Sequence, residues 1–262
     1  KGEKKVSLEE FNKKIFERIV KAKSEERPCS LMGTIFEGNI MFGYYDKNNP
    51  LPELHFFEAI FSVEANFRNT TFGGDASFTN ATFNGRADFS FVTFSGKANF
   101  LEVTFSGEAD FSHTTFSGEE THFFEATFRE EADFFDARFH GNANFFDVTF
   151  SKKAIFSSAK FNGSAYFVGK MSKEGVFENG AQFNNFSVKE KTWFEGVNLR
   201  EVSFLYSDLR NCDFINCEWR KKGGREILYD EVSLFGEKGK GILGKAKTWF
   251  PSLKQGDGKK IK

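Results

Sequence analysis

The chain has 262 residues, 39% of them apolar, and a formal net charge of -1. This length allows one large domain or two small ones, and the charge predicts neither a nucleic acid nor a membrane as the partner. Phenylalanine dominates the apolar residues, with 38 Phe against three Trp, five Tyr and three Met. The sequence therefore uses one side chain repeatedly for one kind of position.

The cysteine content and the hydropathy indicate a compartment. Cys29, Cys212 and Cys217 are too few for a disulfide framework, which favours a reducing environment. No signal peptide is visible, and no apolar run approaches the roughly 18 residues of a membrane span. We therefore expect a cytoplasmic protein that makes no membrane contact through this chain.

Residues 7 to about 26 are predicted to form an amphipathic helix. Ser7 and Glu10 have the spacing of a capping box, and Pro28 ends the helical pattern. One stripe of this helix is apolar and contains Leu8, Phe11, Ile15, Ile19 and Ala22. We expect residues 1–28 to cap the repetitive segment next to them in the chain.

Residues 29–221 are repetitive. In the segment ADFSFVTFSGKANFLEVTFSGEADF, successive phenylalanines are five, six, five and six residues apart: Phe89, Phe94, Phe100, Phe105 and Phe111. Each Phe has a small residue two positions earlier, and residues two apart point the same way only in an extended chain. Each unit is therefore predicted to be a very short strand with an inward-facing pair. Units that turn in the same direction wind a β-solenoid with a phenylalanine core.

Residues 192–221 consist of six consecutive five-residue units, TWFEG VNLRE VSFLY SDLRN CDFIN CEWRK. This run resembles the pentapeptide-repeat family. The resemblance implies an all-β fold for residues 29–221, a right-handed four-sided β-helix. It also implies a homodimer formed through the C-terminal coil, because similar proteins dimerise at that end.

The sixth residue of every second unit leaves two geometries open, a two-sided coil of two units and a four-sided coil of four units. Stacked positions should resemble one another, so the residue after each Phe discriminates between them. Alternate five-residue units give Phe57, Thr79, Leu101, Phe124, Phe146 and Val168. The interleaved units give Arg68, Ser90, Ser112, Phe135 and Ser157. The first set is apolar and the second polar, with one exception each, which favours the four-sided coil.

A coil of four such units takes about 22 residues, and this length predicts about nine coils. Their first units begin at Cys29, Leu54, Ala76, Ala98, Thr121, Ala143, Ala165, Phe186 and Ser207. One corner of the coil repeats glycine, at Gly74, Gly96, Gly118, Gly141 and Gly163. We expect φ > 0 at these glycines, since glycine adopts it without strain. Residues 45–53 are expected to form an enlarged corner loop, and residues 170–174 a local irregularity.

Residues 222–262 are expected to form a basic tail, as a loop or loosely packed. From Lys221 onward there are 11 Lys or Arg against five Asp or Glu. Residues 239–246 (GKGILGKA) nearly fit a phosphate-binding loop, but Ala246 stands where that loop needs Ser or Thr. The short segment after Gly244 cannot supply the βαβ unit that either glycine motif needs.

No catalytic, cofactor-binding or metal site is predicted. The four histidines fall at different places within their units and so do not converge on a metal: His55, His113, His122 and His140. Cys212 and Cys217 occupy the small inward position, which favours core packing over a redox pair. The Ser and Thr residues are repeat positions, and none is paired with a candidate base.

The residues that follow the inward Phe of alternate units should point outward as an apolar ladder: Phe57, Leu101, Phe124, Phe146 and Val168. Such a stripe is unusual on a soluble monomer. Three interpretations stay open: a surface for a protein partner or a second copy, a strip covered by the tail, and rings that stack on one another in solvent. The tail residues suited to cover it are Leu234, Phe235, Ile242, Leu243, Trp249 and Phe250.

Acidic residues are concentrated in residues 102–147, which contain 11 Asp or Glu and two Arg. The predicted acidic surface consists of Glu102, Asp110, Glu125, Asp133 and Asp147. Asp110 and Asp133 are expected to stack with Asp88 on the face opposite the ladder, and the other three to lie beside the ladder with Glu58. Charge that repeats every ~5 Å resembles the spacing of a DNA backbone. Some proteins of the family that the chain resembles mimic DNA and bind type II topoisomerases. A solvated face is the other interpretation, because Lys152, Lys153 and Lys160 interrupt the stripe.

These patterns predict a non-catalytic scaffold that presents solenoid faces to an unidentified protein partner, with no enzymatic activity and no cofactor. A DNA-mimic binding protein that acts on a type II topoisomerase is the alternative. A module of a larger or membrane-attached protein is a further one, since some similar proteins carry additional domains.

Overall fold

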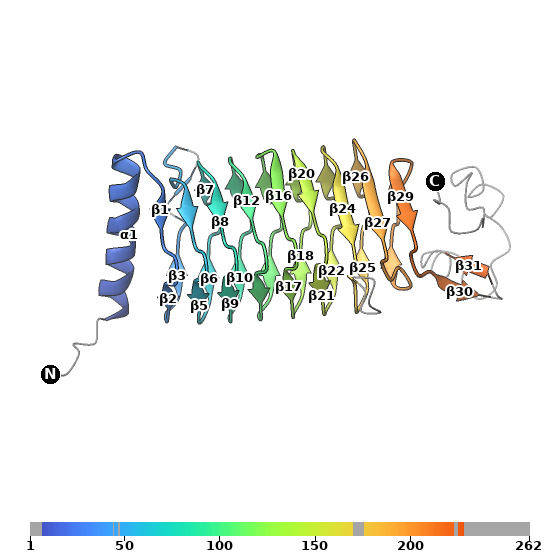
Figure 1. Cartoon of the computed structure of the whole chain (residues 1–262), viewed down its shortest axis with the longest axis horizontal. Coiled ribbons are helices and arrows are strands. Elements are labelled where there is room, and N and C mark those ends of the chain that lie inside the picture. The colour runs from blue at the N-terminus through green and yellow to red at the C-terminus, as the bar shows by residue number, and fades with distance from the viewer. Residues whose placement is uncertain (1–6, 44, 47, 170–175, 223–224, 228–262) are drawn as a thin grey trace.

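The computed structural model describes residues 7–43, 45, 46, 48–169, 176–222 and 225–227. One helix, α1 (Leu8–Ser24), lies across the end of a long stack of short strands (Figure 1). The Ser7 side chain accepts a hydrogen bond from the Glu10 backbone N–H at 3.2 Å, which caps the helix as predicted. Ile15, Ile19 and Ala22 are the buried residues of the apolar stripe.

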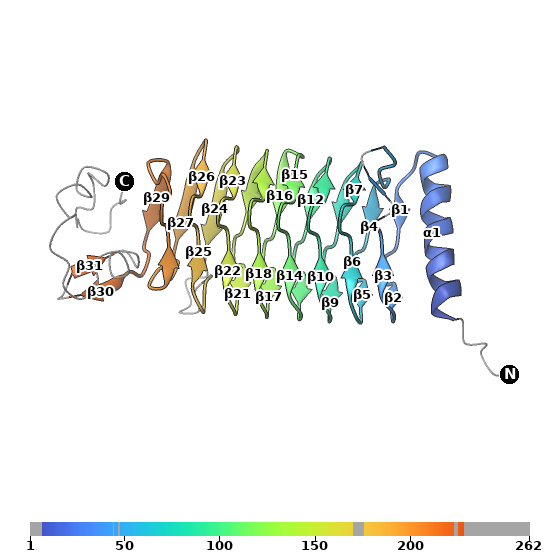
Figure 2. The same ribbon diagram turned by 180° about the vertical axis from the view of Figure 1, so that it is seen from behind.

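Helix α1 packs on the first coil of the stack. The ring centroids of Phe11 and Phe36 lie 5.9 Å apart, and those of Phe16 and Phe42 lie 5.7 Å apart. The Lys23 ammonium donates a hydrogen bond to the backbone carbonyl of Pro50 at 2.6 Å. The helix thus covers phenylalanine rings that would otherwise face solvent at this end, opposite the C-terminal end of the stack (Figure 2).

Each coil contributes strands to four parallel sheets, which we name faces A, B, C and D in chain order. Face A contains β1 (Cys29–Ser30), β4 (Leu54–His55), β8 (Ala76–Ser77), β12 (Ala98–Asn99), β16 (Glu120–His122), β20 (Asn142–Asn144), β24 (Ala165–Val168), β27 (Thr192–Glu195) and β29 (Cys212–Ile215). Face B contains β2 (Ile35–Phe36), β5 (Ile60–Phe61), β9 (Thr82–Phe83), β13 (Thr104–Phe105), β17 (Thr127–Phe128) and β21 (Thr149–Phe150). Face C contains β3 (Ile40–Met41), β6 (Ala65–Asn66), β10 (Ala87–Asp88), β14 (Ala109–Asp110), β18 (Ala132–Asp133), β22 (Ala154–Ile155), β25 (Ala181–Gln182) and β28 (Val202–Ser203). Face D contains β7 (Thr71–Phe72), β11 (Thr93–Phe94), β15 (Thr115–Phe116), β19 (Arg138–Phe139), β23 (Lys160–Phe161) and β26 (Ser187–Val188).

The strands pair with the next coil in a constant register. Thr104 and Phe105 lie beside Thr82 and Phe83 of the preceding coil, and each of the four faces repeats this pairing. The stack makes about eight turns, so at roughly 4.8 Å per turn it is about 38 Å long. The predicted four-sided coil is therefore confirmed.

The core consists of phenylalanine columns. Within a column the rings are nearly parallel, as for Phe100 and Phe123 on face A, whose centroids lie 4.8 Å apart with planes 3° apart. Between opposite faces the rings meet edge to face, as for Phe100 and Phe111 at 5.3 Å and 89°. Burial of each ring contributes roughly 1.5 to 3 kcal/mol, and favourable ring pairs about 0.5 to 1.5 kcal/mol beyond that.

Corners A–B and C–D are tight turns. After Phe78 the chain turns through Thr79 and Asn80, and the Ala81 N–H donates to the Phe78 carbonyl at 2.9 Å. Asn80 has a left-handed backbone, with φ of 56°, as the third residue of a type II turn does. The five-residue unit therefore contains a complete turn.

The corner glycines do not have the predicted backbone conformation. Positive φ occurs at Gly33, Gly180 and Gly196, and not at the repeated glycines of corners B–C and D–A. A Cβ added to Gly163 would lie 2.5 Å from the carbonyl carbon of Gly141 in the adjacent coil, and one added to Gly107 would lie 2.6 Å from that of Gly85. Glycine is therefore required by the close approach of neighbouring coils, not by its φ.

The last two predicted coil starts, Phe186 and Ser207, are wrong. On face A, Ala165 pairs with Thr192, and Thr192 pairs with Cys212. The coil after Ala165 is longer because additional residues separate Phe167 from Phe177, which takes the face B position beside Phe150. The irregularity predicted at residues 170–174 lies outside the described residues. The coil after Thr192 is shorter because all its units have five residues.

The start of the predicted tail contains a hairpin. Strand β30 (Arg220–Lys222) pairs antiparallel with β31 (Arg225–Ile227), so the last coil leads into this hairpin and not into a simple loop. Residues 228–262 lie outside the described part of the chain. In the loop predicted at residues 45–53, Tyr45 and Leu51 are buried, and Leu51 forms a bridge beside Phe72 on face D.

Candidate interaction surfaces

The residues of the predicted apolar ladder lie in one column along corner A–B. We call the outer surfaces of corners A–B and C–D the A–B edge and the C–D edge. Each ladder residue follows the inward Phe of a face A strand, and consecutive coils are joined at the A–B edge by backbone hydrogen bonds. The Glu102 N–H donates to the Phe124 carbonyl at 2.9 Å, and the Glu125 N–H donates to the Phe146 carbonyl at 2.9 Å. The Phe124 and Phe146 rings stack with centroids 5.7 Å apart. Phe146 is 38% exposed, and the other ladder residues are half-buried: Phe57, Leu101, Phe124 and Val168.

Three apolar residues that were not predicted extend this surface. Met32, which is 61% exposed, takes the ladder position of the first coil, where the Gly33 N–H donates to the Phe57 carbonyl at 2.9 Å. On face A, Tyr166 and Trp193 stack with centroids 4.8 Å apart and planes at 2°. An aromatic residue between the small residue and the Phe of a unit is the signal that would have found this pair.

An acidic rim runs beside the ladder and consists of Glu58, Glu102, Glu125 and Asp147. Each directly follows a ladder residue and has φ of 54 to 55°. This left-handed conformation costs an L-residue roughly 1 to 2 kcal/mol, and Asn or Asp tolerates it better than Glu. Within the described part of the chain, no ion pair involves Glu58, Glu102 or Glu125.

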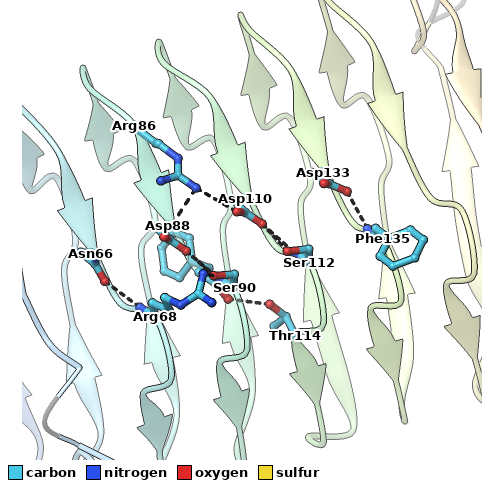
Figure 3. Close-up of polar contacts among 11 residues, drawn as sticks. Asn66, Arg68, Arg86, Asp88, Ser90, Asp110, Ser112, Thr114, Asp133 and Phe135 are labelled. Atoms are coloured by element: carbon cyan, nitrogen blue, oxygen red, sulfur yellow. Dashed lines mark hydrogen bonds and ion pairs between the residues drawn. The ribbon is translucent and has the colours of Figure 1, made fainter.

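A second acidic column lies on face C, where Asp88, Asp110 and Asp133 are register partners (Figure 3). Each carboxylate accepts a hydrogen bond from the backbone N–H two residues further on, as Asp88 does from Ser90 at 3.0 Å. The Arg86 guanidinium lies 2.9 Å from the Asp110 carboxylate and 3.5 Å from that of Asp88. These aspartates therefore hold the turns after them, and one arginine offsets the charge of two.

The surroundings of Asp133 favour the protonated form of its carboxyl group. Burial raises the pKa of Asp133 above its usual range. The hydrogen bond from the Phe135 N–H acts in the opposite direction, while the carboxylates of Asp110 and Glu131 raise the pKa further. The face C column is thus not an array of equivalent free charges.

The structure separates the five residues of the predicted acidic surface into two groups. Asp110 and Asp133 lie on face C, whereas Glu102, Glu125 and Asp147 lie at the A–B edge. Faces A and C are two strands apart in every coil and therefore lie on opposite sides. The face C column is short as well, since Asn66 precedes Asp88 and Ile155 follows Asp133 in the register.

The C–D edge carries an aromatic row that was not predicted: Phe91, His113 and Phe135. Phe91 is 45% exposed and stacks on His113 with ring centroids 4.5 Å apart, while Phe135, 41% exposed, meets His113 edge-on at 5.5 Å. The Arg68 guanidinium lies 5.0 Å from the Phe91 ring centroid, and an Asp136 oxygen lies 3.2 Å from Nδ1 of His113. A Phe outside the small-x-Phe position, as in FSFVTF and ADFFD, is the sequence signal for this row.

The cysteines lack a reactive environment. Burial raises the pKa of Cys212 and of Cys217 to about 12, so both are thiols at neutral pH and weak nucleophiles. The Cys217 thiol donates to the Phe194 carbonyl at 3.1 Å.

The histidines are spread over the solenoid. His55 and His122 lie on face A, His113 at the C–D edge, and His140 after the face D strand β19. Where side chains are described, no group of three or more His, Cys, Asp or Glu residues is placed to hold a metal ion.

The tail residues expected to cover the ladder, Leu234, Phe235, Ile242, Leu243, Trp249 and Phe250, lie outside the described residues, as does the glycine and lysine motif at 239–246. The one described helix is neither long nor apolar enough to cross a membrane.

Comparison with protein families gives two matches. The profile described as "Pentapeptide repeats (9 copies)" matches residues 56–104, and the profile described as "Pentapeptide repeats (8 copies)" matches residues 191–218. No curated protein and no solved structure is significantly similar to the chain.

Proposed function

We propose that this chain, in which pentapeptide repeats are detected, is a non-catalytic scaffold that binds a protein partner through its A–B edge. Pentapeptide-repeat proteins are repeat scaffolds that are typically non-enzymatic. The observation that carries this proposal is the apolar ladder, which runs over four successive coils from Leu101 to Val168 on the outside of the solenoid, with Thr79 between Leu101 and Phe57. Of the other phenylalanines in the described residues, all but Phe11, Phe16, Phe91 and Phe135 are buried. Apolar residues exposed in a continuous column are typical of interaction surfaces.

The chemistry of the edge supports a protein partner. The stacked rings of Phe124 and Phe146 present their edges, and aromatic groups dominate the energetics of protein interfaces. The acidic rim lies directly beside them and would orient a partner of opposite charge and speed its approach.

Affinity capture with matched variants tests this function. The wild-type chain, the Phe124→Ser/Phe146→Ser variant and the Phe91→Ser/Phe135→Ser variant are immobilised and exposed to an extract of the native host. The second variant removes two exposed phenylalanines from the C–D edge and serves as the control. We expect a protein captured by the wild type and the control but lost with Phe124→Ser/Phe146→Ser. Equal capture by all three would refute the proposal.

A homodimer through the C-terminal coil is a second arrangement to be tested, because face A ends there. Among the described strands, β29 pairs only with β27, which leaves one edge of β29 without a strand partner. Light scattering of the wild type measures the dimer, and the Phe124→Ser/Phe146→Ser variant distinguishes the two routes. A dimer that this variant abolishes uses the ladder, and a dimer that persists uses the last coil.

The DNA-mimic function remains the alternative on one observation, the face C column of Asp88, Asp110 and Asp133. Arg86 offsets part of its charge, and the A–B acidic rim lies on the other side of the solenoid. We therefore expect no inhibition of DNA supercoiling by gyrase. Inhibition that Asp110→Asn relieves would favour mimicry instead.

A further inference from the structure

The A–B edge combines two features that select one kind of ligand. The apolar ladder offers ring edges and aliphatic groups, and the acidic rim places carboxylates one or two coils apart beside it, at roughly 4.8 Å per coil. Glu58, Glu102 and Glu125 keep a left-handed backbone although asparagine fills the same turn position at Asn80. A carboxylate kept at such a position is a candidate for function. The matching ligand is an extended segment with apolar side chains and lysines.

Residues 238–262 of the chain have this composition. They contain eight Lys and a single acidic residue, Asp257. Their apolar side chains are Ile242, Leu243, Trp249, Phe250, Leu253 and Ile261. Positive charge and aromatic groups thus occur in one short segment, and the complementary groups occur together at the A–B edge.

The segment is long enough to reach the edge of its own chain. The described chain ends at Ile227 beyond the last face A strand, and Val168 lies on β24, two strands before β29. Two coil steps are roughly 10 Å, whereas residues 228–237 span up to about 33 Å when extended. The ladder from Phe57 to Val168 covers five coil steps, about 24 Å, which is well within the span of residues 238–262.

We propose that residues 238–262 bind along the A–B edge of the same chain, with their apolar side chains on the ladder and their lysines at the acidic rim. This rests on the proposed function in taking the A–B edge as the binding surface, and it adds the class of ligand. A partner of the edge is then a lysine-rich apolar segment that competes with residues 238–262.

Photo-crosslinking in the full chain tests the contact. Phe146 is replaced by p-benzoylphenylalanine, and in a control chain Phe91 is replaced in the same way, since both are exposed phenylalanines at turns. After irradiation of dilute protein at low salt, the crosslinked peptides are identified by mass spectrometry. We expect at least fivefold more crosslinking to residues 238–262 from position 146 than from position 91, within species of monomer mass. Equal yields, or no crosslinks to this segment from position 146, would overturn the proposal. Crosslinks confined to species of dimer mass would also overturn it and would identify a second copy as the occupant.

Charge variants test the electrostatic half of the contact. Glu102→Gln/Glu125→Gln should lower the yield from position 146 severalfold, while Glu130→Gln/Glu131→Gln, at another corner of the solenoid, should leave it unchanged. An equal effect of both double variants would contradict a specific role of the rim.

Failure here can be told from failure of the proposed function. If position 146 does not crosslink to residues 238–262 but capture of a partner still requires Phe124 and Phe146, the A–B edge binds a partner and the tail is not its ligand. If crosslinking succeeds and no captured protein depends on these residues, the edge serves the chain's own segment alone.

Discussion

The A–B and C–D edges have the same backbone and different side chains. At the A–B edge Glu102 and Glu125 have φ of 55 and 54°, and at the C–D edge Phe91 and His113 have φ of 57 and 56°. In both turns a side-chain oxygen accepts a hydrogen bond from the backbone N–H two residues further on. Asn99 and Asn144 do so at the A–B edge, and Asp88 and Asp110 at the C–D edge. The position before the left-handed residue is mostly apolar at the A–B edge and mostly polar at the C–D edge.

This difference shows that the turn does not require an apolar residue at the ladder position. The C–D edge makes the same turn with serine, for example Ser90 and Ser112, where the A–B edge has leucine or phenylalanine. The turn thus does not account for the ladder, whereas the proposed binding function would. Variants of the two edges, and of the interior and corners that join them, test this explanation.

The interior beneath the two edges should be energetically equivalent. Phe100 on face A and Phe111 on face C are both fully buried and pack against each other. Phe100→Ala and Phe111→Ala should each lower the free energy of unfolding by about 3 to 5 kcal/mol, as measured by urea denaturation. A cost below about 1 kcal/mol at either position would contradict the packed columns.

At corners B–C and D–A, where glycines of adjacent coils lie close together, the addition of a single methyl group should lower the stability of the fold. Gly163→Ala places a Cβ against the backbone of the adjacent coil, so we expect a loss of about 1 to 3 kcal/mol in the same assay. Gly107→Ala is the equivalent change at the other corner and should cost a similar amount. If both variants matched the wild type, the coils would have to be further apart than they are here.

Relief of the left-handed backbone should stabilise either edge. Glu125→Asn and Phe91→Asn place a residue that tolerates this conformation at φ of 54 and 57°, and each should raise the free energy of unfolding by roughly 0.5 to 1 kcal/mol. A loss at Glu125 together with a gain at Phe91 would show that the acidic rim stabilises the fold, and would weaken its assignment to binding.

The smallest effect concerns pH and face C. Because the pKa of Asp133 is raised in the folded state, that state holds the proton more tightly, and stability falls as the pH rises through the raised pKa. Asp133→Asn keeps an oxygen to accept the Phe135 N–H and has no proton to lose. The variant should be more stable than the wild type at pH 7, by up to about 0.5 kcal/mol, and the gain should disappear below the ordinary Asp pKa of about 3.9. A variant that is less stable at pH 7 would mean that the ionised carboxylate makes a favourable contact.

Much of the fold could be predicted from the sequence. Phenylalanines recur at gaps of five and six, each with a small residue two positions earlier, and few structures are compatible with this pattern. The alternation between Leu101 and Ser112, one half-coil apart, was enough to choose four faces over two. The coil starts after Ala165 were misplaced, since the pairing of Thr192 depends on how many residues the preceding corner accommodates. The role of Gly163 was missed because a distance between coils leaves no local signal.

The candidate surface was predicted in part. The ladder follows from periodicity, so Phe124 and Phe146 could be placed in one column. The stack of Tyr166 on Trp193 was missed although both units carry an aromatic residue in their middle position, because the start of the later unit's coil was wrongly placed. The side of each acidic residue follows from the unit to which it belongs, so the sequence could place Asp133 opposite the ladder and Glu125 beside it, and the order of the sheets has them on these two sides.

The most direct test of the ladder as a binding surface is the stability of the Phe124→Ser/Phe146→Ser variant beside that of Phe123→Ala and Phe145→Ala, the buried neighbours in the sequence. Urea denaturation should show that the double ladder variant loses less than about 2 kcal/mol, whereas each buried substitution loses about 3 to 5 kcal/mol. A double ladder variant that loses as much as the buried ones would make the ladder part of the core and would remove the reason to assign it to binding.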